Sequence, residues 1–263
     1  MRVVASFYPL AFAAEQVGGD AVSVIDLTPP GVEPHDLELG AEDLEAIADA
    51  DVVVLLGGGF QPAVEDAVAA EATGAVIDVL DGLAPPPMDG PDGSADPHVW
   101  LDPDRYDGVV ARIASALQDA GVDTSAGAPA FAAQLADLGD AFDEGLAPCR
   151  GKLLVTTHSA FGYLAAAHGL RQEAIAGLSP ESEPDPARLA ALIAVIREEG
   201  VRTVFTEALA SPDAAQTLAA ETGAAVAVLD PLEGLAQDRV DAGEDYLSVM
   251  RDNLAVLREG LGC

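Results

Sequence analysis

Hydrophobic positions along the chain follow two alternating patterns. Short apolar runs, typical of buried strands, alternate with longer segments in which apolar residues recur every three or four positions, as in helices. Strands are predicted at 3–7, 21–27, 51–56, 75–79, 152–156, 203–206 and 224–229. Helices are predicted at 10–17, 41–50, 62–72, 104–119, 160–167, 187–199, 211–221 and 246–259. This alternation is typical of an α/β fold, in which helices cover both faces of a mostly parallel sheet.

One longer helix interrupts the alternation. Residues 129–146 carry apolar side chains at helical spacing, and Pro129 and Pro148 mark the beginning and end of the segment. Because the strand–helix pattern restarts afterwards, the sequence predicts two α/β lobes. The predicted limits are 1–124 for the N-terminal lobe, 125–148 for the linking helix and 149–263 for the C-terminal lobe. A chain of 263 residues is long enough for two domains of this size.

Acidic residues dominate the charge. The chain has 45 Asp plus Glu against 12 Lys plus Arg, a net charge of −33. Such a surface repels nucleic acid and anionic lipid and attracts cations. Alternatively, the negative charge only keeps the protein in solution. No nucleic-acid partner is therefore expected.

The sequence gives little direct evidence of where in the cell the protein is located. No run of 18 apolar residues is present, and the first residues lead directly into a predicted strand, so no signal peptide is visible. Cys149 and Cys263 fit one disulfide in an exported protein or two idle thiols in a cytosolic one.

Three of the four histidines follow predicted strands or the loops after them. His35 ends a proline-rich loop, His98 ends the loop at 81–97, and His158 follows the strand at 152–156. Ligands of open α/β sheets bind beyond the carboxyl ends of the strands. We therefore expect His35 and His98 to face His158 across a cleft between the lobes.

Two acidic residues occupy the same kind of position. Asp230 follows the strand at 224–229, and Glu207 follows the strand at 203–206. Glu207 has an alternative interpretation as a sheet-edge carboxylate without a role. His168 precedes a glycine at the end of a predicted helix, where the helix dipole favours a histidine cap, so it is not predicted as a ligand.

His98 has the most informative surroundings. Residues 96–103 read Asp-Pro-His-Val-Trp-Leu-Asp-Pro. Pro97 restricts the backbone to a bent turn, and a carboxylate behind an imidazole fixes its tautomer for metal binding. Taken alone, this segment equally fits a turn histidine beside a packed tryptophan.

Five segments together resemble one family of metal-binding proteins. They are Val3–Leu10, Pro34–Glu38, Asp96–Pro103, His158–Leu164 and Asp230–Leu232. In this order they are similar to the first strand and the four ligand motifs of the zinc/manganese-binding, ZnuA-like (cluster A-I) solute-binding proteins of bacterial ABC importers. The resemblance covers essentially the whole chain.

The resemblance implies metal capture between two lobes bridged by a rigid helix, and delivery of the metal to a membrane permease. Carried over onto the motifs, the metal ligands are His35, His98, His158 and Asp230, and Glu207 lies near the metal without binding it. It also implies a periplasmic or membrane-anchored extracytoplasmic protein whose export signal is absent from this sequence. We expect a monomer; whether a metallochaperone loads it stays open.

Zinc is the expected metal. Three imidazoles and one carboxylate suit four-coordinate Zn²⁺, whereas Mn²⁺ prefers more oxygen ligands. Manganese members of the family tend to have a carboxylate where this chain has His158. Because protonated imidazoles release metal, zinc affinity should fall below about pH 6.5. The loop at 81–97 is the segment expected to move on binding.

Three functions are alternatives to zinc import: a manganese-binding importer component, a metal-dependent adhesin of the same family and a zinc hydrolase. A hydrolase could use three histidines on zinc with Glu207 as general base. Against it, Asp230 fills the fourth position and no H-E-x-x-H motif occurs. We therefore predict that the protein is not an enzyme.

Overall fold

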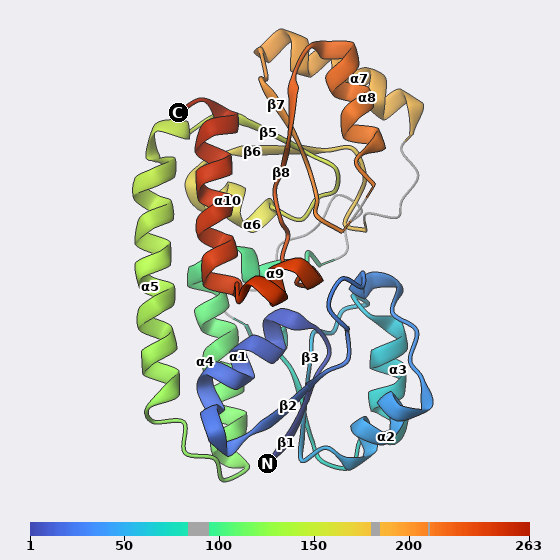
Figure 1. Ribbon diagram of the computed structural model, residues 1–263, viewed down its shortest axis with the longest axis vertical. Helices are drawn as coiled ribbons and strands as arrows, with labels where there is room; N and C mark the ends of the chain where they lie inside the picture. Colours follow the sequence, from blue (N-terminus) through green and yellow to red (C-terminus); the bar gives the residue numbers. More distant parts are fainter. Residues whose placement is uncertain (84–94, 180–184, 210) are drawn as a thin grey trace. The chain divides into compact units, whose positions relative to one another are not determined.

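The computed structural model describes residues 1–83, 95–179, 185–209 and 211–263. The chain divides into two compact units, each built around a four-stranded parallel sheet flanked by helices (Figure 1). The first unit combines 1–87, 103–137 and 232–246, and the second combines 88–102, 138–231 and 247–263. The predicted fold class, two α/β lobes with parallel sheets, is confirmed. The lobe limits, with a linking helix at 125–148, stay a prediction.

The sheet of the first unit has the strand order β2-β1-β3-β4. Its strands are β1 (Arg2–Ala5), β2 (Ser23–Asp26), β3 (Val52–Leu55) and β4 (Ala75–Asp78). Helices α1 (Tyr8–Gly18) and α4 (Pro103–Asp119) cover one face, and α2 (Ala41–Asp49) and α3 (Pro62–Glu71) cover the other (Figure 1). The central strand β3 is buried throughout because both faces are covered, which explains its unbroken apolar sequence.

The second unit repeats this order as β6-β5-β7-β8. Its strands are β5 (Leu153–Thr156), β6 (Arg171–Ala174), β7 (Thr203–Thr206) and β8 (Ala225–Val228). Its helices are α6 (Gly162–His168), α7 (Pro186–Glu199), α8 (Asp213–Thr222), most of α10 (Tyr246–Leu261) and the second half of α5 (Gly127–Leu146). In both sheets the strand order reverses between the two central strands, β1 and β3 or β5 and β7. Ligands of open α/β sheets bind at such a point, beyond the carboxyl ends of the strands.

A disulfide joins Cys149 to Cys263 within the second unit, with the Cα atoms 5.4 Å apart. The bond ties the C-terminal end of α10 to the segment before β5. Along the same helix, Gly260 packs against Phe205 so closely that an added Cβ would lie 2.5 Å from the ring. The structure thus pairs the two cysteines, which the sequence left open.

Two elements were not predicted. The edge strand β6 reads Arg-Gln-Glu-Ala, too polar for a strand to be recognised by hydrophobicity. The short helix α9 (Gln237–Ala242) has no buried residue and therefore no apolar stripe. Among the described residues, no helix combines the length and apolar character needed to cross a membrane. Most of the loop at 81–97, expected to move, falls on residues 84–94 and so lies outside the described residues.

Candidate metal site

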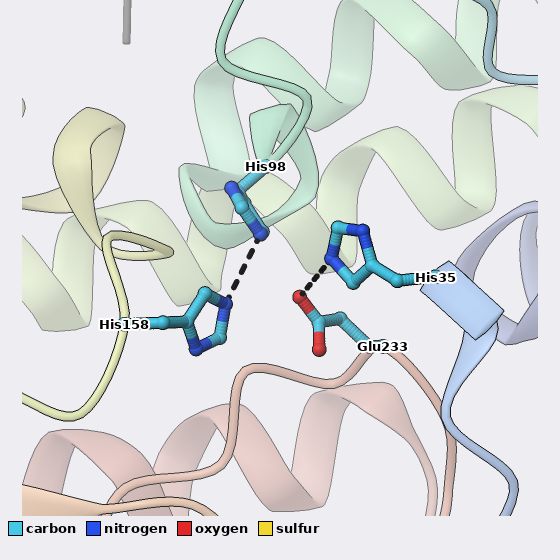
Figure 2. A group of neighbouring side chains, drawn as sticks. All are labelled: His35, His98, His158 and Glu233. Carbon is cyan, nitrogen blue, oxygen red and sulfur yellow. Dashed lines mark hydrogen bonds and ion pairs between the residues drawn. The ribbon is translucent and has the colours of Figure 1, made fainter. Parts of the chain in front are cut away.

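The second unit brings two of the predicted histidines together. His98 immediately precedes a 3-10 turn at Val99–Leu101, and His158 lies two residues beyond β5. Their Nε2 atoms point toward one another at 3.4 Å, and both side chains are fully buried (Figure 2). The turn predicted for His98 from Pro97 is thus present, as is the strand end predicted for His158.

A buried carboxylate stands behind each of these imidazoles. Asp96 Oδ1 lies 2.8 Å from His98 Nδ1 and also accepts the backbone N–H of His98. Glu207 Oε1 lies 2.7 Å from His158 Nδ1 and accepts the backbone N–H of His158 and the hydroxyl of Thr157. In His98, a proton on Nδ1 that is donated to Asp96 leaves the Nε2 lone pair available to a metal. Beside His158, Glu207 places a negative charge near the same ring nitrogen.

Neighbouring side chains fix the backbone that carries these groups. The hydroxyl of Tyr163 donates to the carbonyl of Asp96 at 2.8 Å, and Gln172 donates to the carbonyl of His158 at 3.2 Å. Gly162 allows the close approach of Asp96, because a Cβ there would lie 2.7 Å from Asp96 Oδ2. The backbone at Asp96 and at His158 is therefore held by hydrogen bonds from neighbouring side chains.

The first unit contributes the third histidine together with a carboxylate. His35 lies in a 3-10 turn at Pro34–Asp36, and its Nε2 is 3.5 Å from Glu233 Oε1 (Figure 2). Glu33 accepts the backbone N–H of His35, and the ring of Phe60 meets the imidazole edge-on with centroids 4.6 Å apart. The Glu233 side chain is almost fully buried.

The carboxylate beside His35 is three residues later in the chain than the one the sequence suggested. Asp230 belongs to the second unit, where Asn253 binds both its backbone N–H and its carbonyl, at 2.9 and 2.7 Å. Among the described residues, the potential metal ligands are His35, His98, His158 and Glu233. The segment Asp230–Glu233 carries both carboxylates, but the sequence analysis named only Asp230 and missed Glu233.

The spacing within each pair suits zinc. Two ligand atoms bound to one tetrahedral Zn²⁺ at about 2.0–2.1 Å lie about 3.3–3.4 Å apart. The two nitrogens of the second unit, at 3.4 Å, and the nitrogen and oxygen of the first, at 3.5 Å, both match this separation. Each pair by itself has the geometry of two ligands on one zinc ion.

Comparison with known proteins identifies the family. The family model described as zinc-uptake complex component A, periplasmic (ZnuA), matches residues 3–260. The chain belongs to the ZnuA family. The resemblance inferred from the ligand motifs is thereby confirmed, and the two-unit fold is a ZnuA fold.

ZnuA relatives include proteins named for zinc. The zinc-binding lipoprotein AdcA of Streptococcus pneumoniae is 35% identical over 277 residues, which cover 98% of this chain and 55% of AdcA. The high-affinity zinc uptake system protein ZnuA of Bacillus subtilis is 33% identical over 279 residues, which cover 99% of this chain and 88% of that protein. The chain thus spans about half the length of the AdcA relatives that it matches.

A solved ZnuA structure is similar over the whole chain. The Zn(II)-bound ZnuA-like domain of Streptococcus pneumoniae AdcA has a TM-score of 0.86 and 35% sequence identity. The similarity covers 100% of this chain and 99% of that domain.

Proposed function

We propose that this protein is the extracytoplasmic solute-binding component of an ABC importer for Zn²⁺. The observation that carries the proposal is the pair of ligand spacings, 3.4 and 3.5 Å, each within about 0.2 Å of the separation of two ligands on tetrahedral zinc. The relatives named for zinc binding and zinc uptake support it.

The proposed ligands are His35, His98, His158 and Glu233, with all four binding one ion. Each offers one atom of a type that zinc accepts, an imidazole nitrogen or a carboxylate oxygen. Asp96 and Glu207 would orient the imidazoles through Nδ1 and raise their basicity. Asp230, the fourth ligand predicted from the sequence, is the alternative to Glu233.

Zinc rather than manganese is the proposed cargo. Three nitrogens and one oxygen complete a tetrahedral zinc site, whereas Mn²⁺ prefers more ligands and more of them oxygen. Imidazole ligands also follow the general affinity order, in which Zn²⁺ binds more tightly than Mn²⁺. In this site Glu233 takes the position that a catalytic zinc keeps open for water, which argues against a hydrolase.

Delivery requires a partner in the membrane. The proposal includes a permease that accepts zinc from the protein, a location outside the cytoplasm and a monomeric state. Membership of the family of periplasmic zinc-uptake components supports the first two. The lipoprotein among the relatives supports attachment to the membrane surface, although this chain aligns with only 55% of it.

The decisive experiment is a competition titration of zinc against a chelator, with three variants beside the wild type. We expect one tightly bound zinc per chain, and a loss of affinity of at least about tenfold in His158→Ala and Glu233→Gln. Asp230→Asn is the matched control, because Asn253 holds that residue through backbone atoms that survive the substitution.

Each contrary result has a distinct meaning. Loss of affinity in Asp230→Asn but not in Glu233→Gln would restore the ligand set predicted from the sequence. Tighter binding of manganese than of zinc, or no effect of His158→Ala, would refute the proposed function.

A further inference from the structure

One residue of the segment between the two candidate carboxylates has an unusual backbone. Leu232 has φ of +54°, and among the described residues it is the one non-glycine residue with positive φ. The left-handed region is unfavourable for a residue with a branched apolar side chain and persists only where the surroundings impose it. Leu232 is fully buried and directly precedes Glu233.

The chain is fixed just before Leu232. Asn253 binds the backbone of Asp230 through two hydrogen bonds, at 2.9 and 2.7 Å. Trp100 donates its indole N–H to the carbonyl of Pro231 at 2.7 Å and is itself fully buried. Two consecutive residues of the second unit therefore have their backbone held by side chains of that unit.

The chain is fixed again just after Leu232, where it enters the first unit. The Glu233 side chain is buried and lies beside His35, with 3.5 Å between Nε2 and Oε1. Two residues later, the carbonyl of Leu235 accepts the backbone N–H of Gly31, from the loop that leads to His35. Since Glu233 is the next residue, the φ of Leu232 helps to set the direction in which the Glu233 side chain leaves the backbone.

We propose that Leu232 is a positioning residue whose left-handed backbone aims the Glu233 carboxylate at the metal. The proposal rests on the proposed function, because Glu233 must be a zinc ligand for its direction to matter. In this role the strain at Leu232 is retained for metal binding, and the anchors at Asp230 and Pro231 offset it.

Two substitutions separate backbone direction from side-chain packing. Leu232→Ile keeps the apolar volume but adds a β-branch, which disfavours positive φ. Leu232→Asn loses apolar packing but tolerates the left-handed conformation. We expect Leu232→Ile to lose zinc affinity by about 10- to 100-fold, as other residues that orient metal ligands do. Leu232→Asn should lose thermal stability instead, and keep zinc affinity close to that of the wild type.

Two further measurements test whether Leu232 affects zinc binding through Glu233. In a Glu233→Gln background, Leu232→Ile should cause no additional loss of zinc affinity. The visible absorption spectrum of bound Co²⁺ should be the same in Leu232→Ile as in Glu233→Gln, because both sites would lack the carboxylate. If Leu232→Ile fails to fold, Trp100→Phe replaces it, since it keeps an aromatic ring but removes the hydrogen bond to Pro231.

The outcomes distinguish this role from the proposed function. If both Leu232 variants lose zinc affinity in proportion to their loss of stability, Leu232 only packs and the positioning role is refuted. The same holds if Glu233→Gln weakens zinc binding while Leu232→Ile, or Trp100→Phe in its place, does not. If Glu233→Gln binds zinc as the wild type does, Glu233 is not a zinc ligand. The positioning role of Leu232 is then refuted as well.

Discussion

At the scale of single residues, Glu207 shows how one buried carboxylate can set the state of an imidazole. It lies 2.7 Å from His158 Nδ1 and also accepts hydrogen bonds from the backbone of His158 and the hydroxyl of Thr157. Replacing it with Gln removes the charge that favours a proton on Nδ1. We expect Glu207→Gln to weaken zinc binding about tenfold.

The matched control for Glu207 is Glu199→Gln. Glu199 pairs with Arg171 at the surface, away from the histidines, so the same chemical change there should leave zinc affinity unaltered. Competition titration against a chelator measures both. Equal affinities for Glu207→Gln and the wild type would mean that Glu207 has no influence on the metal.

Asp26, at the end of β2, makes stability depend on pH. Burial, with the charge of Glu15 adding to it, raises the pKa of Asp26 from 3.8 to about 7, although a hydrogen bond from the backbone of Thr28 opposes the shift. The folded protein therefore keeps this proton between about pH 4 and 7, where the unfolded chain loses it. Since the folded state binds more protons in that range, its stability should fall as the pH rises.

Asp26→Asn tests this dependence. The amide stays neutral at every pH and can still accept the N–H of Thr28. We expect the free energy of unfolding of Asp26→Asn, relative to the wild type, to rise between pH 4 and 8 by an amount on the order of 1 kcal/mol or more. Urea unfolding at several pH values measures it, and a difference that does not vary with pH would contradict the prediction.

The residues of the candidate site were predictable where a motif fixes the local backbone. His98 and His158 follow this rule, since a proline turn and a strand end place them as the sequence implied. The backbone between Asp230 and Glu233 was not predictable in this way. Leu232 has a positive φ, and no pattern of apolar and polar residues encodes a left-handed leucine.

At the scale of elements, hydrophobic spacing predicted the four central strands and the edge strands β2, β4 and β8, and missed the edge strand β6. β3, β5 and β7 are buried along their whole length and appear as apolar runs. β6 pairs with one neighbour only and is partly exposed, so polar residues suffice there. The edge strands β2, β4 and β8 are also partly exposed but keep apolar residues, so the polar composition of β6 is what hid it from the sequence.

The first residue of helix α5, Gly127, lies close to the backbone at the end of α1. A Cβ on Gly127 would lie 2.4 Å from the carbonyl oxygen of Val17 and 2.6 Å from that of Gln16, both at the end of α1. Backbone atoms cannot yield as a flexible side chain does. We expect Gly127→Ala to lower the free energy of unfolding by about 1–3 kcal/mol, because the start of α5 must shift.

Gly177→Ala is the matched control, since a Cβ there has no atom within 4 Å. Thermal and urea unfolding of the two variants measure the difference. Equal stability of Gly127→Ala and Gly177→Ala would show that α1 and α5 approach less closely than the structure indicates.

At the scale of the whole molecule, the compact units are not continuous stretches of sequence. The segments 88–102 and 232–246 carry His98 and Glu233 and belong to different units from the residues on either side of them in the chain. Periodicity reports the elements and their order, but it carries no information about which distant segment completes a unit. The sequence alone therefore did not reveal that His98 belongs with His158 in the second unit, and Glu233 with His35 in the first.

Zinc bound by all four ligands should stabilise both units together. A ligand at a free concentration of 100 times its dissociation constant adds about 2.7 kcal/mol to the free energy of unfolding. Because His98 and His158 lie in one unit and His35 and Glu233 in the other, a single ion can protect both only if it is bound by ligands from both units. We expect zinc to slow amide hydrogen exchange in β5 and β7 of the second unit as well as in β1 and β3 of the first. A chelator should reverse both effects, and His158→Ala should reduce both. Protection confined to β5 and β7 would mean that the histidine pair binds the ion without His35 and Glu233, and protection confined to β1 and β3 would mean the converse.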